Sequence, residues 1–213
     1  MSTRQHRKAA TRQSLKDAAL VCFAEHGLHE TSIGMITRAA GVAHGTFYVH
    51  YATKEAVLDD LLDDFNAAFT ARLLPVVTAT DRALPEALRA VAEAFLDHWQ
   101  AHRGFIEAYA QRVAAGLSLV ALRDGLSQTM VEVVAAWLVA VAARSGGTLD
   151  APTLVAQALL AMWFRLGLQH LFNSDVGREQ AVDLLARMTH GALAAIVPEL
   201  AGSSLPTLDA TTP

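Results

Sequence analysis

The sequence predicts an all-α protein in which a small three-helix head precedes a larger helical bundle, with about nine helices in all. Apolar residues recur at intervals of three and four along most of the chain, and no segment shows the alternation of a strand. The 213 residues are 53% hydrophobic and 18% charged. This composition excludes general disorder and allows a substantial core.

The first helix of the head has its apolar residues at positions i, i+3, i+4, i+7 and i+8, namely Leu15, Ala18, Ala19, Cys22 and Phe23. Gly27 is its expected C-terminal stop. Thr31 and Ser32 then offer an N-cap for a short helix from Ile33 to about Ala40, which Gly41 ends. A second short helix is expected from about His44 to Tyr51.

The longer helices follow. Thr53 is the expected N-cap of a helix that reaches Leu74 and ends at Pro75. Pro85 and Pro152 fall in the first turns of later helices, where proline is tolerated. These later helices are expected over residues 84–101, 104–115, 120–144, 152–172 and 178–197. The tail from Pro198 reads as flexible, because it is rich in Gly, Ser, Thr and Pro. The expected division is therefore 1–53, 54–197 and 198–213.

Three features favour a cytoplasmic protein that does not span a membrane. The longest apolar run, from Val133 to Ala143, has eleven residues, whereas a membrane span needs roughly 20. The basic N-terminus has no apolar segment behind it and does not resemble a signal peptide. The single cysteine, Cys22, cannot form an internal disulfide and fits a reducing compartment as a small core residue.

The net charge of −4 hides an asymmetry between the two ends of the chain. Residues 1–54 carry seven Lys or Arg and three acids, a balance of +4, and the remaining 159 residues carry −8. Five of the nine histidines also lie in the first 54 residues. A basic head on an acidic body suggests that only the head meets a polyanion. An ordinary solvated basic terminus would give the same charge pattern.

Two short helices joined by the turn at residues 40–43 are typical of a helix-turn-helix. In the second helix Phe47 and Tyr51 are four apart and can join Ile33, Ile36 and Val42 in a small core. The adjoining arc then presents polar and small residues outward: His44, Gly45, Tyr48 and Val49. Such groups suit phosphate oxygens and base edges in a major groove. A generic helical hairpin with exposed polar residues is the alternative.

Residues 12–62 resemble the DNA-binding domain of the TetR family of transcriptional regulators. The resemblance rests on a run of about fifty residues with these matching segments: Phe23-Ala24-Glu25-His26-Gly27, Thr31-Ser32-Ile33, Ile36, Ala39-Ala40-Gly41-Val42, Gly45-Thr46-Phe47-Tyr48-x-His50-Tyr51 and Lys54-Glu55-Ala56. It implies an all-α fold in which an N-terminal helix-turn-helix DNA-binding domain is joined to a larger helical ligand-binding and dimerisation domain.

The resemblance also implies residue roles. Positions expected to hold the DNA backbone are Thr31, with Ser32 beside it, Tyr48, His50 and Lys54. Positions expected to read bases are His44, Gly45, Thr46 and Val49. Lys54 also opens a helix, where its charge adds to the positive end of the helix dipole. The basic segment from Arg4 to Arg12 is expected to act as an arm that enters a neighbouring minor groove.

Three positions depart from the family pattern. Ala43 replaces a common serine and cannot cap the recognition helix, and losing a cap costs about 1 kcal/mol. His44 stands where Lys or Arg is frequent, so its attraction for phosphate should depend on pH. Gly34 has no side chain to reach a base. Because the charge of histidine changes near neutral pH, His44 and His50 together lead us to expect that DNA affinity rises as the pH falls from 8 to 6.

A homodimer is expected through the helices at about 152–172 and 178–197. Their small residues permit close approach, and the family usually forms its four-helix dimer interface there. The alternative is that these two helices only close a monomeric core. Two-fold symmetry would match a palindromic double-stranded DNA operator.

A pocket for a small, mainly apolar or aromatic effector is expected in the middle helices. Its candidate residues combine large adaptable side chains with a few polar groups: Trp99, Phe105, Tyr109, Arg112, Met130, Trp137, Met162, Trp163, Arg165 and His170. Each aromatic residue and methionine could equally be plain core. For Arg165, pairing at the surface or an interface comes ahead of ligand contact.

His98 and His102 are four apart, a spacing that can hold a metal with His170 or Glu107 as a third ligand. Trp99 stands where a hydrolytic zinc helix would carry glutamate, and no nucleophile–base pattern or phosphate loop is present. We therefore predict no catalytic site, cofactor or metal. The prediction is a ligand-released transcriptional repressor. A metal- or ligand-sensing helical dimer without DNA release and a small helical enzyme remain as alternatives.

Overall fold

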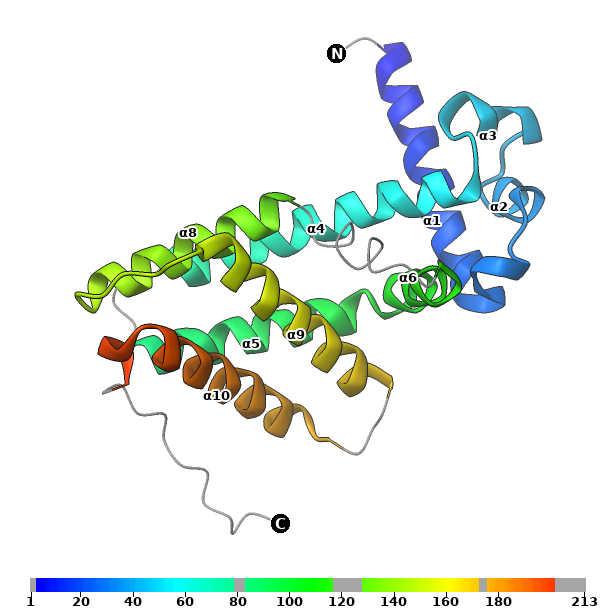
Figure 1. The fold of residues 1–213 in the computed structure, drawn as a ribbon. Helices are drawn as coiled ribbons and strands as arrows, with labels where there is room; N and C mark the ends of the chain where they lie inside the picture. The colour runs from blue at the N-terminus through cyan, green and yellow to red at the C-terminus, as the bar shows by residue number, and fades with distance from the viewer. Residues whose placement is uncertain (1–2, 79–82, 117–127, 173–175, 202–213) are drawn as a thin grey trace. The chain divides into compact units, whose positions relative to one another are not determined.

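The computed structural model describes residues 3–78, 83–116, 128–172 and 176–201. Within these ranges the chain is helical throughout, as the periodicity predicts (Figure 1). Nine α-helices and a short 3-10 helix follow in this order: α1 (Thr3–Glu30), α2 (Ile33–Ala39), α3 (His44–His50), α4 (Lys54–Thr78), α5 (Leu84–Ala101), α6 (Arg103–Gly116), α8 (Gln128–Arg144), α9 (Pro152–Phe172), α10 (Arg178–Ile196) and η1 (Pro198–Leu200).

The helices pack as two compact units, and each has a core of its own. The first holds α1, α2, α3, the part of α4 up to residue 67, and α6. The second holds the rest of α4 with α5, α8, α9, α10 and η1. By packing, then, α6 belongs with the head, although it follows α5 in the sequence. The predicted domain boundary after residue 53 divides the chain by function, into a DNA-binding part and an effector-binding part, and it stays a prediction.

The first unit closes around a small core formed where α1, α2, α3 and α4 meet. Its fully buried side chains are Leu15, Ala19, Phe23, Ile36, Phe47, Val57 and Leu58. Between α2 and α3, Gly41 has φ = 67°, a left-handed conformation that glycine adopts without steric cost. The amide of Val42 donates to the carbonyl of Thr37 (3.0 Å), which closes the turn. α6 packs along α1 in the same unit (Figure 1).

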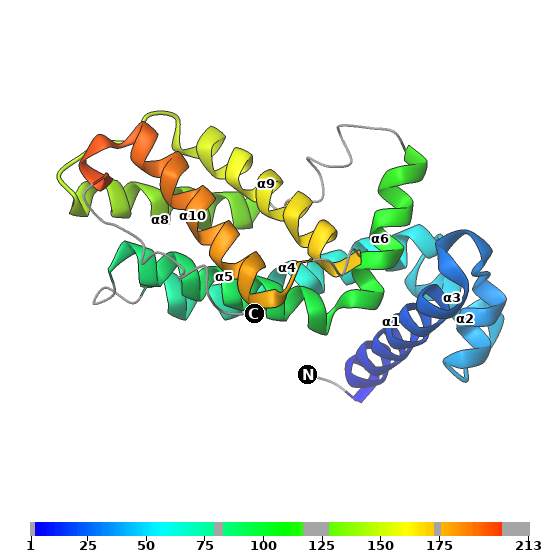
Figure 2. The ribbon, with the colours of Figure 1, turned by 90° about the horizontal axis from the view of Figure 1, so that it is seen from below.

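The second unit is a bundle in which α9 lies beside both α8 and α10 (Figures 1 and 2). Gly167 of α9 permits a close approach to α5, because a Cβ there would lie 2.8 Å from the Trp99 ring and 2.9 Å from the Phe95 ring. One buried cluster joins α8, α9 and η1: Val131, Leu138, Val141, Ala142, Ala156, Leu159, Val197 and Leu200, with Leu193 of α10.

Three element boundaries differ from the prediction. α4 continues through Pro75 to Thr78. Pro75 has no N–H to donate to the carbonyl four residues earlier and its ring crowds that carbonyl, and α4 continues for only three residues beyond it. α1 begins at Thr3, well before its apolar face. The predicted flexible tail starts with an ordered turn, Pro198–Leu200, whose Leu200 is buried.

Other parts of the prediction fall outside the described residues. α8 begins at Gln128, so the expected helical segment 120–127 lies outside them, as does the tail beyond residue 201. Among the helices that the structure describes, none is long and apolar enough to cross a membrane.

Candidate nucleic-acid interface

α3 is held to the first unit by one side and exposes the other. Phe47 is fully buried, and Tyr51, which follows the helix, is nearly so. The opposite side presents Tyr48 and Val49, whose exposed fractions are 55% and 67%. Single exposed apolar residues are common, but here two large ones share a seven-residue helix. The exposed side is the candidate DNA-reading surface.

The N-terminal turn of α3 completes this surface. Gly45 has no atom within 4 Å of the position that a Cβ would take, so its backbone is open to a close approach. The His44 ring meets the Tyr48 ring edge to face, with centroids 5.6 Å apart. Thr46 is half-buried. As expected, Ala43 provides no side-chain cap.

The turn before α2 divides the two hydroxyl residues between different tasks. The exposed Ser32 accepts a hydrogen bond from the Met35 amide (3.2 Å) and caps α2, as predicted. Thr31 is only 1% exposed, and its hydroxyl lies within hydrogen-bond distance of the Gly27 and Cys22 carbonyls (2.7 and 3.0 Å). The structure thus gives Thr31 an internal role, and Ser32 is the residue open to a phosphate.

Lys54 opens α4, yet its amino group points into the protein. Nζ donates to the carbonyls of Leu28, His29 and Thr31 at 2.7, 2.8 and 2.8 Å. These carbonyls belong to the corner between α1 and α2, where backbone oxygens lack helical partners. An ammonium group has three protons, so these bonds use its full donor capacity. This arrangement favours a structural role for Lys54 over the predicted phosphate contact.

Arg12 is also committed to the fold. Its Nε donates to Asp60 Oδ2 (2.7 Å), which also accepts from the Tyr51 hydroxyl (2.5 Å). The guanidinium carbon lies 5.3 Å from the centre of the Tyr51 ring, a cation–π distance. Lys16, which is buried, pairs with Asp64. These contacts join α1 and α4 to the C-terminal end of α3.

The same network sets the ionisation of Asp60 and Tyr51. Burial alone would raise the pKa of Asp60, but hydrogen bonds from Arg12 and Tyr51 and the charge of Lys16 outweigh it and hold that pKa below its usual range. Burial, and then the hydrogen bond to Asp60, raise the pKa of Tyr51. The pair therefore stays a carboxylate and a neutral phenol at neutral pH.

His50 ends α3 beside the basic side of α1. Burial, followed by the positive charges of Lys8 and Arg12, lowers the pKa of His50 from its ordinary value. Its Nδ1 is buried and has no hydrogen-bond partner among the described residues. A lowered pKa favours a neutral imidazole at pH 7, so His50 would contact a phosphate in its charged form only at lower pH.

The basic N-terminal segment is helical, which corrects the expectation of an arm. Arg4, Arg7 and Lys8 are exposed on the first turns of α1. An α-helix with side chains is about 10–12 Å wide, whereas the minor groove is about 6 Å wide. As a helix, this segment cannot thread a minor groove, and it is suited instead to phosphates along the backbone.

Contacts to distant residues were not predicted. In α4, Asp60 accepts a hydrogen bond from Arg12 of α1, and Asp59 accepts one from Arg112 of α6. In α6, Gln111 accepts one from the Leu28 amide. Asp60 lies inside the segment that resembles the family, but no local pattern marks its partners. Gln111 is 83 residues from its partner Leu28.

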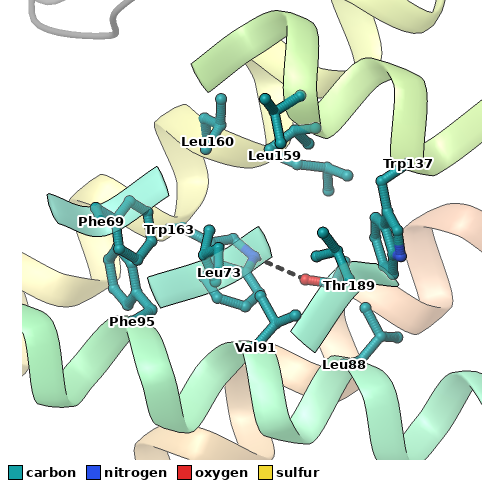
Figure 3. Close-up of a pocket in the computed structure, with 13 residues that line it drawn as sticks. Phe69, Leu73, Leu88, Val91, Phe95, Trp137, Leu159, Leu160, Trp163 and Thr189 are labelled. Atoms are coloured by element: carbon teal, nitrogen blue, oxygen red, sulfur yellow. Dashed lines mark hydrogen bonds between the residues drawn. The ribbon is translucent and has the colours of Figure 1, made fainter. Parts of the chain in front are cut away.

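The second unit contains an apolar cavity of about 50 Å³, shown in Figure 3. Of the predicted ligand residues, Trp137 and Trp163 line it. Trp163 Nε1 donates to the Thr189 hydroxyl (2.8 Å), which in turn donates to the Leu185 carbonyl (2.8 Å). The other lining residues are Phe69, Leu73, Val77, Leu88, Val91, Phe95, Val133, Val134, Leu159 and Leu160.

The remaining predicted ligand residues lie away from this cavity wall. Trp99 and Met130 are buried, and Met162 packs on the α8–α9 cluster. Phe105 and Tyr109 stack on one another in the first unit, where Arg112 pairs with Asp59. Arg165 is exposed on α9, and the His170 ring lies 3.1 Å from the Val176 carbonyl.

The alternative metal site gains no support from the geometry. His102 lies beyond Ala101, where α5 ends, so the two histidines do not share a helix turn. The His98 ring stacks on Phe69 and the His102 ring meets the edge of Phe65. Within the described ranges no group of three or more His, Cys, Asp or Glu could hold a metal.

Comparison with known proteins shows what the helix-turn-helix segment is similar to. Residues 15–61 match the family model described as bacterial regulatory proteins, tetR family. The chain is also 34% identical over 107 residues to the HTH-type transcriptional repressor KstR2 of Mycobacterium tuberculosis. That match covers 49% of this chain and 53% of the relative, so it spans about half the relative's length.

Solved structures share the fold over nearly the whole chain. A TetR-family regulator from Syntrophomonas wolfei superposes with a TM-score of 0.71 at 20% identity, covering 86% of this chain and 95% of that one. RolR in complex with resorcinol gives a TM-score of 0.63 at 20% identity, covering 96% and 100%. At these identities the likeness shows the fold alone.

Proposed function

We propose that this chain, which belongs to the TetR family of transcriptional regulators, is a homodimeric repressor that binds a palindromic operator and is released by a small apolar or aromatic effector. The family consists of DNA-binding regulators rather than enzymes. The observation that carries the proposal is the exposed side of α3, where Tyr48 and Val49 project from a helix anchored by buried Phe47.

The proposed DNA contacts are the accessible residues of the helix-turn-helix. Ser32, His44 and Tyr48 supply polar groups to the phosphates, and Gly45 and Val49 approach the bases of the major groove. The exposed Arg4, Arg7 and Lys8 add charge along the backbone. Repression rather than activation is supported by the KstR2 relative, which is a repressor.

A dimer through α9 and α10 is supported by one exposed, largely apolar face on each helix. On α10, Leu184 and Met188 are 43% and 42% exposed, four residues apart, and Gly191 and Ala195 continue the same face. On α9, the exposed Leu154, Ala158 and Ala161 follow the same periodicity. Small residues between larger ones permit close helix packing.

The cavity in the second unit supports an apolar effector. Among the described residues that line it, Thr189 carries the one hydroxyl, which is already bonded to Trp163 and Leu185, and none is charged. A cavity of about 150 Å³ is known to admit benzene in another protein, so one of about 50 Å³ must widen before an aromatic ligand enters. RolR, of similar fold, was solved with resorcinol, a small aromatic molecule.

Release of the DNA then requires that the effector bind one conformational state of the protein more tightly than the other. If it binds the widened second unit more tightly, it shifts the population of the protein towards that state, whereas equal affinity for both states would shift nothing. We propose that the widened state spaces the two heads unfavourably for the operator.

The test is retention of DNA from the protein's own upstream region, with a scrambled palindrome as control. Specific retention that weakens with salt is expected. Tyr48→Phe should weaken it by roughly two- to ten-fold, the worth of one hydrogen bond, without lowering the melting temperature. Equal retention of both DNAs would refute the operator, and normal binding by Tyr48→Phe would refute the docking of α3.

The effector is sought by thermal shift against a library of neutral aromatic and aliphatic compounds. A true effector raises the melting temperature and releases the retained DNA. A compound that stabilises the protein but leaves the DNA bound supports a sensor without DNA release instead.

A further inference from the structure

In the corner between α1 and α2, side chains from two other helices bind the backbone of one residue, Leu28. At Gly27 the backbone leaves the helix, with φ = 78° and ψ = 162°. In a continuous helix the next amide, that of Leu28, would donate to the carbonyl four residues earlier. Here it donates to Gln111 Oε1 of α6 at 2.8 Å. The contact is close enough that a Cβ on Gly27 would lie 3.0 Å from the same oxygen.

The carbonyl of Leu28 is held from a different direction. It accepts a hydrogen bond from Lys54 Nζ at the start of α4 (2.7 Å). Both backbone polar groups of Leu28 are therefore bound by side chains, the amide by one from α6 and the carbonyl by one from α4. Leu28 is 3% exposed, so water has poor access to replace either partner. A buried backbone group without a partner is costly.

This corner leads directly into the DNA-reading elements. Four residues beyond Leu28 the chain reaches Ser32, which caps α2, and α2 in turn packs against α3. α6 is joined to α4 as well, because Arg112 pairs with Asp59. A displacement of α6 along α1 would break the Gln111 bond, and Leu28 could recover a partner only if the corner moved too.

We propose that Gln111 is a positioning residue for operator binding. It acts through the Leu28 amide and fixes the corner from which α2 and α3 project. It does so from α6, which begins 53 residues after the last residue of α3 (Arg103 and His50). This inference rests on the proposed DNA-binding function, and it adds to it a residue outside the segment that matches the family model.

The experiment compares two replacements of Gln111 in the full-length chain. Gln111→Met keeps the length of the side chain but cannot accept the hydrogen bond. Gln111→Glu keeps an acceptor oxygen at the same reach. Gln128→Met is the matched control, because Gln128 is an exposed glutamine of α8 that bonds to Glu132. Operator affinity is measured at fixed ionic strength, together with hydrogen exchange of the Leu28 amide.

The expected result is a selective loss. Gln111→Met should weaken operator binding by roughly two- to ten-fold and speed exchange at Leu28, while Gln111→Glu and Gln128→Met stay close to the wild type in exchange. A purely structural effect would lower the melting temperature and speed exchange throughout the first unit instead. That outcome, or faster exchange at Leu28 with unchanged operator affinity, overturns the proposal.

A double-mutant cycle with Lys54→Met tests whether the two side chains act on one element. Because they bind the two backbone groups of the same residue, their effects on operator affinity should not add, with the double variant losing less than the product of the two single losses. Independent, multiplicative losses would contradict a shared corner.

If the wild type itself fails to bind its upstream DNA, the proposed function is wrong. The exchange rate of the Leu28 amide still reports whether Gln111 binds it.

Discussion

At two glycines in the head, the effect of a substitution on stability can be measured separately from its effect on DNA binding. Gly34 and Gly45 each occupy the second position of a short helix, α2 and α3. An added Cβ would meet nothing within 4 Å at Gly45 and only Ser32 Oγ at 3.8 Å at Gly34. Both sites therefore have room for alanine in the free protein, and only one of them lies on the proposed DNA-reading surface.

We predict that Gly45→Ala and Gly34→Ala each stabilise the protein by up to about 0.5–1 kcal/mol, because alanine loses less backbone entropy than glycine in a helix. Only Gly45→Ala should weaken operator binding, since its methyl group would lie between backbone and duplex. Thermal unfolding and operator titration measure the two effects. An unchanged operator affinity for Gly45→Ala would show that the backbone does not approach DNA there.

His50 gives a prediction about pH. Its lowered pKa in the free protein means that it is neutral at pH 7, so its contribution to stability is complete above about pH 6.5, the ordinary value for histidine, and is lost as the pH falls towards the lowered pKa. A nearby phosphate would raise this pKa, and DNA binding would then take up a proton.

Operator affinity should accordingly change little through His50 between pH 8 and 7 and rise below about pH 6.5. The measurement is made in a His44→Gln background, so that His50 is the one histidine left in α3. Adding His50→Gln should abolish the rise. If the two profiles coincide, His50 does not contact phosphate in its charged form.

At the scale of helices, Gly167 decides how closely α9 packs on α5. Gly167→Ala would bring a methyl group to within 2.8–2.9 Å of two buried aromatic rings, Trp99 and Phe95. These rings cannot move aside as a flexible side-chain end would. We predict a loss of about 1–3 kcal/mol from overpacking, measured by denaturant unfolding. Gly104→Ala is the control, because its Cβ would make an ordinary 3.5 Å contact with Ala24. Equal stability of both variants would contradict the close approach.

The helices show which features the sequence could predict. Their positions depend on local periodicity and caps, and Ser32, Gly41 and the proline at the start of α9 act as expected. The sequence predicts the end of α4 at Pro75, but the helix continues for three residues beyond it. The partners of Lys54 and Gln111 could not be predicted, since they depend on how α4 and α6 pack against a corner distant in sequence.

The candidate sites follow the same rule. The exposed side of α3 could be predicted from the spacing of Phe47 and Tyr51, because a short helix with one buried face must expose the other. Of the residues that composition suggested for a ligand pocket, Trp137 and Trp163 line the cavity, and their binding of a ligand stays a prediction. Composition could not distinguish them from Trp99 and Phe105, because large apolar side chains line cavities and fill cores equally well.

At the scale of the whole molecule, the proposal requires two heads acting together. One head offers a seven-residue recognition helix with few charged groups, and its lysine and arginine neighbours Lys54 and Arg12 are bonded within the fold. Binding two half-sites through one dimer raises affinity because the second head binds as an intramolecular step, a gain of about 10²–10⁴-fold. Operator affinity should therefore depend on the face formed by α9 and α10 more than on any single contact of α3.

We predict that Leu184→Glu, on the exposed face of α10, yields a folded monomer and lowers operator affinity by about 100-fold or more. A charge placed in an apolar dimer interface would be buried without a partner, which is costly. Val139→Glu is the control, because Val139 of α8 is similarly exposed but lies outside the two proposed interface helices. Sedimentation analysis gives the mass, and circular dichroism verifies the fold. If Leu184→Glu remains dimeric, or if Val139→Glu is the variant that dissociates, the dimer uses another face.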